Sequence, residues 1–116
     1  PAQQIPDNDL GGIESKIEVQ ESGSIVRLDI PVDISHTWIG DLRVLLVSPS
    51  GTEIVLHDKS GRSRHDIKMT YITTTDEAML ALLSSEVHGI WRLKVVDTYS
   101  RDIGTLNSWG IHCVYE

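Results

Sequence analysis

Residues 36–51 read HTWIGDLRVLLVSPSG, and this stretch decides the fold. LRVLLV, residues 42–47, is apolar at nearly every position, which is typical of a strand covered on each side or lying centrally in a sandwich. Ser48-Pro49-Ser50-Gly51 then matches a type I turn, with Pro at the second position and Gly at the fourth. The following TEIVLH can return as a second strand. The stretch therefore predicts a hairpin at the centre of a β domain.

A period of two continues on the N-terminal side of this hairpin. In SIVRLDIPVDI a row of apolar residues alternates with a mostly polar row, so one face of a strand is expected to be buried. The expected buried residues are Val26, Leu28, Ile30, Val32 and Ile34. Pro31 cannot donate a ladder hydrogen bond and is expected at a sheet edge or a bulge. Residues 13–19 alternate in the same way and predict another amphipathic strand.

Further strands are predicted at residues 66–72, 90–97 and, after a turn at Gly104, 106–116. Thr74 and Glu77 form a capping-box pattern ahead of an Ala, Leu and Met run, which predicts one short helix near 75–84. Seven or so short strands separated by turn signals are typical of an all-β sandwich.

Length and composition limit the classes of protein that this chain can be. Its 116 residues suit one domain. Ten Lys and Arg against seventeen Asp and Glu give a formal net charge of -7, so no nucleic-acid partner is expected. No apolar run approaches the ~18 residues of a membrane span. The start, PAQQIPDND, has no initiator Met and no leader, so we expect a piece of a larger protein. We also expect the isolated domain to be monomeric.

Catalytic motifs are not found in the sequence. It has no G-x-S-x-G, H-E-x-x-H, G-x-x-x-x-G-K-[ST] or G-x-G-x-x-G. The five His are expected on different strands and loops, and the single cysteine, Cys113, has the neighbours of a buried strand residue. We therefore expect no catalytic residue in this chain.

The acidic loops are better candidates for a binding site. Calcium takes six to eight oxygen ligands, which short acidic loops can supply. Asp7 and Asp9 before the first long strand, and Asp97 and Asp102 around a turn, are the candidate ligands. The alternative is that these side chains cap their own turns through local hydrogen bonds.

Trp38, Trp91 and Trp109 could form a platform for stacking against carbohydrate. Trp91 alternates with Leu93 and Val95, which favours the core. Trp38 lies in a loop beside Gly40 and is the candidate binding residue.

Three separated blocks together carry a family resemblance. HTWIGDLRVLLVSPSGTEIVLHD, then DEA, then GIWRLKVVDTYSRDIGTLNSWGI resembles the P domain, or Homo B domain, that follows the catalytic domain in kexin- and furin-like subtilases and in many bacterial secreted proteases. The matched positions that we expect to be structural are His36, Gly40, Asp41, Pro49, Gly51, Trp91, Asp97, Gly104 and Trp109. The blocks cover nearly the whole chain, so residues 1–116 are expected to form one such domain.

The resemblance implies a jelly-roll β-sandwich with no catalytic triad of its own. It also implies that the domain packs against a protease catalytic domain of the same polypeptide, supports its folding, stability and calcium dependence, and is secreted. The parent is expected to be a serine endopeptidase of the subtilisin and kexin type, with a secreted metalloprotease as an alternative. A calcium-dependent module that binds substrate or glycan is the alternative function.

The resemblance also assigns roles within HTWIGD and shows one departure. His36 is expected to fix its loop by hydrogen bonding rather than act as a base. Asp41 is expected to accept backbone N–H groups or share a calcium, and Gly40 allows a close backbone approach. The family usually carries a longer, aromatic loop before the G-x-W motif, where this chain has only a short, helical-looking segment at 76–88.

Overall fold

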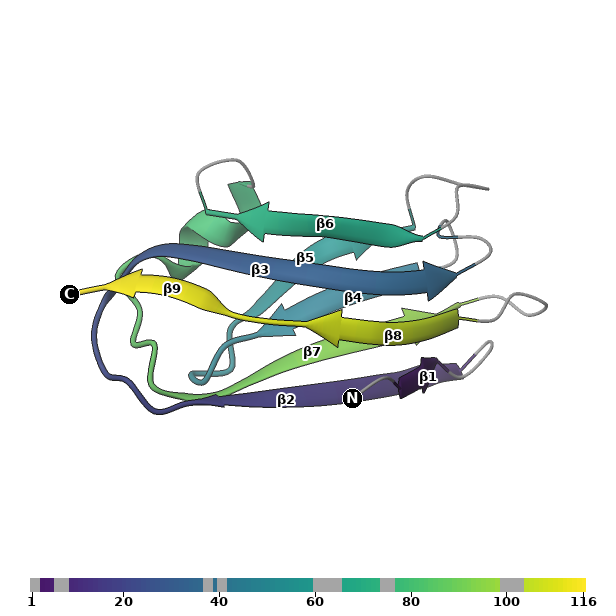
Figure 1. Cartoon of the computed structure of the whole chain (residues 1–116), viewed down its shortest axis with the longest axis horizontal. Helices are drawn as coiled ribbons and strands as arrows, with labels where there is room; N and C mark the ends of the chain where they lie inside the picture. Colours follow the sequence, from purple (N-terminus) through teal and green to yellow (C-terminus); the bar gives the residue numbers. More distant parts are fainter. Residues whose placement is uncertain are drawn as a thin grey trace.

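The computed structural model describes residues 3–5, 9–36, 39, 42–59, 66–73, 77–98 and 104–116, without the side chains of residues 3, 4 and 9–11. Within these residues the chain forms strands and one short 3₁₀ helix (Figure 1). In chain order they are β1 (Gln3–Ile5), β2 (Asp9–Val19), β3 (Ile25–His36), β4 (Leu42–Val47), β5 (Glu53–Asp58), β6 (Ile67–Ile72), η2 (Glu77–Leu82), β7 (Gly89–Asp97), β8 (Gly104–Trp109) and β9 (His112–Tyr115).

The strands form two antiparallel sheets that pack face to face. One sheet has the order β1-β8-β3-β6, with β9 also paired to β3, and the other has the order β2-β7-β4-β5. The pairs are nested: β4 with β5, β3 with β6, β2 with β7 and β1 with β8. This is the pairing of one long hairpin rolled into two layers, which is a jelly roll. The predicted all-β, jelly-roll sandwich with one short helix is confirmed.

The predicted hairpin is formed by β4 and β5 of the second sheet, in which β5 is an outermost strand. Leu42, Val44 and Leu46 are fully buried, and β4 lies between β7 and β5. The turn closes as predicted, because the Gly51 amide donates to the Ser48 carbonyl at 2.9 Å. Burial of each such aliphatic side chain contributes about 1.5–3 kcal/mol.

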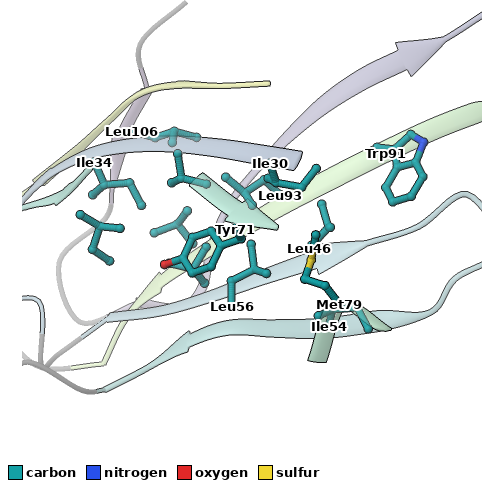
Figure 2. Close-up of a cluster of buried hydrophobic side chains, with 14 of the residues drawn as sticks. Ile30, Ile34, Leu46, Ile54, Leu56, Tyr71, Met79, Trp91, Leu93 and Leu106 are labelled. Carbon is teal, nitrogen blue, oxygen red and sulfur yellow. The ribbon is translucent and has the colours of Figure 1, made fainter. Parts of the chain in front are cut away.

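The core fills the space between the two sheets (Figure 2). Leu106, Ile30 and Ile34 face it from the first sheet, and Leu46, Leu93 and Trp91 face it from the second. Trp91 is fully buried, and its indole N–H donates to the Val87 carbonyl at 2.9 Å. Its polar atom is therefore satisfied inside the core.

The predicted buried face of β3 is wrong at its first residue. Val26 is 48% exposed, whereas Ile25 is only 2% exposed. The pairing of β3 with β9 shifts between Ile25 and Arg27, so Val26 is the extra residue of a β-bulge. The bulge reverses the alternation at that point, and Leu28, Ile30, Val32 and Ile34 keep the expected burial.

Pro31 lies in the middle of the first sheet and not at an edge, because β3 has neighbours on both sides. Its carbonyl accepts from the Gly110 amide at 3.1 Å. A strand residue directs its N and C=O to the same side, so the missing N–H of Pro31 faces the interruption between β8 and β9. The neighbouring strand is broken where proline has no hydrogen to donate.

Two other predicted segments take a more broken form. The run predicted as one strand from 106 to 116 is β8 and β9, separated at Gly110 and Ile111. The predicted helix is the 3₁₀ helix η2, whose Met79 and Leu82 are both buried. Residues three apart share one face of a 3₁₀ helix, so this spacing matches its three residues per turn.

Candidate functional site

Several candidate residues converge at one end of the sandwich, which we call the aspartate end. Here β3 ends at His36, β4 begins at Leu42, β7 ends at Asp97 and β8 begins at Gly104. Asp97 lies opposite both Leu42 and Asp9, its partners in the adjacent strands. Four strands from separate stretches of the sequence therefore begin or end close to Asp97 in space.

A histidine and an aspartate join the two sheets at this end. Nε2 of His36, on β3, lies 3.0 Å from Oδ2 of Asp97, on β7, and both side chains are 0% exposed. An ionised carboxylate only accepts hydrogen bonds, so against it Nε2 is the donor. Because β3 and β7 belong to different sheets, this buried contact ties one layer to the other.

Gly104 fits against this histidine because it has no side chain. It lies directly opposite His36 in the β3–β8 ladder. A Cβ at this position would lie 2.5 Å from Cδ2 of His36 and 2.6 Å from the Ser35 carbonyl oxygen. The sequence interpretation placed a turn here, but Gly104 is the first residue of β8 and its requirement is space.

Asp66 is a residue of the aspartate end that the sequence did not suggest. Its carboxylate accepts from the His36 amide at 2.9 Å, and its own amide donates to the His36 carbonyl at 3.0 Å. Asp66 has a φ of 65°, a conformation that Asp tolerates better than most residues. The sequence interpretation made Asp66 the first residue of a strand at 66–72, whereas β6 begins at Ile67 and leaves Asp66 just before it.

The chain between β3 and β4 has a further anchor. Nε2 of His57, on β5, donates to the carbonyl of the buried Ile39 at 2.8 Å. The amide of Lys59 donates to the Leu42 carbonyl at 2.8 Å. The C-terminal end of β5 therefore contacts the chain at Ile39 and again at Leu42.

The remaining predicted site residues are placed as follows. Asp7, Trp38, Gly40, Asp41 and Asp102 lie outside the described residues, and of Asp9 the structure describes only the backbone. Pro49 and Gly51 lie in the β4–β5 turn, and Pro49 packs against Gly89 of the G-x-W motif, where an added Cβ would lie 2.7 Å from that of Pro49. The roles of His36 and Asp41 in fixing their loop stay predictions.

The tryptophans of the described residues do not form an exposed platform. Trp91 is buried in the core. Trp109 is half-buried, and its indole N–H donates to Oγ of Ser15 at 2.9 Å, which is a second polar contact between the sheets. Trp38, the predicted binding residue, is not among them.

The described residues do not bring metal-binding side chains together. Across residues 3–5, 9–36, 39, 42–59, 66–73, 77–98 and 104–116, no three His, Cys, Asp or Glu side chains lie close enough to hold an ion. The one candidate ligand with a described side chain, Asp97, directs Oδ2 to His36. The described donors alone therefore do not make a calcium cage, and the predicted ligand set depends on Asp7, Asp41 and Asp102.

The chemistry open to the buried pair is restricted by its burial. A general base must reach its substrate within hydrogen-bonding distance, and neither His36 nor Asp97 has any accessible side-chain surface. The pair positions strand ends and does not contact solvent. The fold and this site define a small sandwich domain held together at one end by buried polar contacts.

Comparisons with known proteins identify the family. The family model described as "Proprotein convertase P-domain" matches residues 25–113. The chain belongs to this family, and the P domain is a non-catalytic domain of proteases.

Individual relatives are bacterial proteases. The chain is 37% identical over 110 residues to leupeptin-inactivating enzyme 1 of Streptomyces exfoliatus, covering 92% of this chain and 23% of that protein. It is 35% identical over 109 residues to a calcium-dependent protease of Nostoc sp., covering 91% and 16%. It is 37% identical over 107 residues to a transglutaminase-activating metalloprotease of Streptomyces mobaraensis, covering 90% and 13%. The chain thus spans less than a quarter of these relatives.

A solved structure has the same fold. The serine protease of Aeromonas sobria superposes with a TM-score of 0.75 at 18% identity, covering 100% of this chain and 26% of that one.

Among the residues described here, no helix has the length and apolar character that a membrane crossing requires.

Proposed function

We propose that this chain is the accessory domain of a secreted serine endopeptidase of the subtilisin and kexin type, and that it stabilises and modulates the adjacent catalytic domain. The observation that carries the proposal is family membership over residues 25–113, together with relatives four or more times longer than this chain. A buried pair without solvent access supports a stabilising role rather than a catalytic one. Secretion is proposed from the same family membership.

Several large apolar side chains are exposed on both sheets and on η2, and an adjacent catalytic domain would cover some of them. Those at least 36% exposed are Val26, Val55, Met69, Leu80, Leu83, Ile90, Val114 and Tyr115. Val55 and its cross-strand neighbour Leu45 share the outer face of the second sheet. Leu45 and Val47, on the outer face of β4, are thus only partly buried.

The test uses the parent protease with a weakened and an unweakened domain. Gly104→Ala is expected to destabilise the domain, whereas Gly110→Ala places a Cβ at ordinary contact distance, 3.5 Å from Pro31. If the domain stabilises the catalytic domain, the first variant shortens the half-life of protease activity on heating and the second does not. Equal half-lives would refute the proposal.

The isolated domain provides a second test. Purified residues 1–116 are expected to cleave no casein or peptide substrate. Turnover that persists with a serine-protease inhibitor would contradict the non-catalytic assignment. Inhibition of the parent protease by a serine-directed reagent, and not by a chelator of catalytic zinc, would support the proposed serine parent.

Calcium binding at the aspartate end is part of the same proposal. It is supported by the convergence of the strand ends beside Asp97 and by the relative named calcium-dependent protease. A ligand that binds the folded state alone stabilises it by about 2.7 kcal/mol at a hundred times its Kd. The melting temperature of residues 1–116 should therefore rise from chelator to millimolar calcium, and less in an Asp7→Asn, Asp102→Asn variant. An unchanged melting temperature would remove calcium from the proposal.

A further inference from the structure

A groove lies between the two sheets along their open side. It has a volume of about 440 Å³ and is lined from β2 by Ile17 and Val19 and from the C-terminal segment by Ile111, Cys113 and Tyr115. Glu18 and Glu21 add negative charge to the β2 wall. The groove thus combines apolar side chains from both sheets with polar surface, which includes His112 and an acidic rim at β2.

Both strands that border the groove are edges. β2 is the outermost strand of its sheet, and within the described residues β9 pairs with β3 alone. Glu116 exchanges both backbone hydrogen bonds with Ser24. Because backbone groups alternate in direction along a strand, those of Cys113 and Tyr115 point away from β3, towards the open edge.

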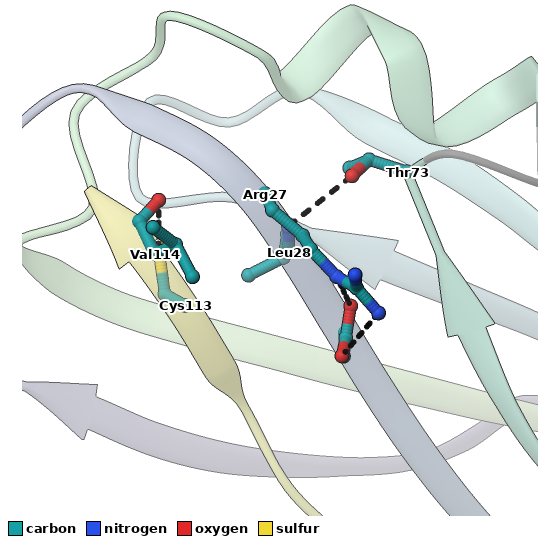
Figure 3. Close-up of polar contacts among 6 residues, drawn as sticks. Arg27, Leu28, Thr73, Cys113 and Val114 are labelled. Atoms are coloured by element: carbon teal, nitrogen blue, oxygen red, sulfur yellow. Dashed lines mark hydrogen bonds and ion pairs between the residues drawn. The ribbon is translucent and has the colours of Figure 1, made fainter.

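The Cys113 side chain faces the groove. Cys113 lies directly opposite the fully buried Leu28, whereas Val114 is 56% exposed on the other face of the strand (Figure 3). Burial raises the pKa of the Cys113 thiol above its ordinary value. An added strand at this edge would place alternate side chains against Ile17, Val19 and Cys113.

The topology indicates which polypeptide would lie there. β1 pairs antiparallel with β8, with Gln3 opposite Leu106. β8 and β9 follow one another along β3 in the same direction. A chain that extended β1 backwards would therefore run antiparallel along β9, and roughly seven residues upstream of Pro1 would reach Tyr115.

We propose that the groove receives an extended strand of the parent protease, the polypeptide that leads into β1, paired with the open edge of β9. This inference rests on the proposed function, in which the domain is attached to a protease. Backbone pairing supplies the affinity, and the alternate side chains supply the specificity. The acidic rim favours a segment with apolar residues at every second position and a Lys or Arg at the β2 side.

The experiment uses Cys113 as a probe, because it is the single cysteine of the chain. Residues 1–116 are compared with a form extended at the N-terminus by the roughly fifteen residues that would precede the domain in the proposed parent protease, a length sufficient to extend past β9. Cys113 of the longer form is expected to react with iodoacetamide at least about tenfold more slowly. The Cys113 and Tyr115 amides are expected to gain protection from hydrogen exchange. The His112 and Val114 amides, which face β3, should be protected in both forms.

Three controls separate the outcomes. A longer form whose extension is replaced by Gly/Ser should react like residues 1–116. The longer form with Val19→Glu, which charges the groove, should also react like residues 1–116. Val114→Glu, on the opposite face of β9, should keep the protection. Equal reactivity of the two forms would overturn the inference, as would protection that depends on protein concentration, which would assign the groove to a second copy.

This test and the half-life test of the proposed function can fail separately. If Gly104→Ala shortens the half-life of the parent protease but Cys113 is equally reactive in both forms, the groove assignment fails and the function stands. If the protection is found but the half-life is unchanged, the strand assignment stands and the stabilising function fails.

Discussion

Replacing Gly104 with alanine would place a methyl group against the buried end of the His36–Asp97 contact. The new Cβ would lie 2.5 Å from Cδ2 of His36 and 2.6 Å from the Ser35 carbonyl oxygen, both far inside ordinary contact distance. The Ser35 oxygen belongs to the backbone of β3 and moves little. The imidazole of His36 therefore has to shift, and its bond to Asp97 lengthens or breaks.

Two costs combine in this variant. Forcing an extra carbon into a packed site costs typically about 1–3 kcal/mol. Weakening a buried hydrogen bond to a charged group costs about 1.5–3 kcal/mol. The free energy of unfolding should thus fall by about 2.5–6 kcal/mol. The melting temperature should fall by roughly 4 °C for each kcal/mol in a domain of this size.

Urea unfolding of residues 1–116, followed by tryptophan fluorescence, measures this change. Gly110→Ala is the matched control, since the nearest atom to its Cβ would be Cγ of Pro31 at 3.5 Å, and we expect a change within about 0.5 kcal/mol. In a His36→Ala background the cost of Gly104→Ala should shrink, because the ring atom is gone while the Ser35 contact remains. A Gly104→Ala variant as stable as the wild type, or an undiminished cost in the double variant, would refute the steric account.

Three further changes test other contacts. Asp97→Ala removes the acceptor of a buried histidine, so urea unfolding should show a loss of about 3 kcal/mol or more. Asp97→Asn keeps an amide oxygen and should lose less, and the reverse order of the two variants would contradict the pairing. Trp91→Phe loses the bond to the Val87 carbonyl and leaves a small cavity, so calorimetry should show a loss of about 1–3 kcal/mol, and an unchanged melting temperature would argue against the contact. The Glu86 carboxylate accepts hydrogen bonds from the Gly23 amide and the His88 amide. These bonds, the one from Gly23 first, lower the pKa of Glu86 below its ordinary 4.5. The contribution of Glu86 to stability is therefore present above pH 4.5 and is lost as the pH falls through the lowered pKa. Glu86→Gln should accordingly reduce stability at pH 7 and converge with the wild type in strong acid, and a constant difference across that range would exclude the linkage.

Local pattern predicted the hairpin and the sandwich because both depend on neighbouring residues. LRVLLV followed by SPSG determines strand, turn and return within a short stretch, and the structure has all three. The bulge at Val26 could not be predicted, since Ile25 and Val26 are both apolar and β-branched and either can be buried. It depends on the pairing with β9, at the far end of the sequence.

The contact between His36 and Asp97 could not be predicted from the sequence for a related reason. His36 and Asp97 are 61 residues apart, and their contact depends on the crossing of two sheets. The resemblance singled out both residues and Gly104, yet gave no sign that the first two touch or that the glycine makes room for the ring. Pro31 shows the opposite case, in which a correct rule about a missing donor was satisfied by a break in the neighbouring strand rather than by a sheet edge.

The nested pairing of the strands also orders the events of folding. The β4–β5 hairpin closes across the short turn at Ser48–Gly51, whereas the β1–β8 ladder joins Gln3 to Leu106 and closes a loop that includes nearly the whole chain. Long loops close late because their entropy cost comes before any contact compensates for it. The domain should therefore form from the central hairpin outwards, and β1 should detach first when the native state opens locally, which makes the N-terminal segment the first target of a protease that acts on the folded domain.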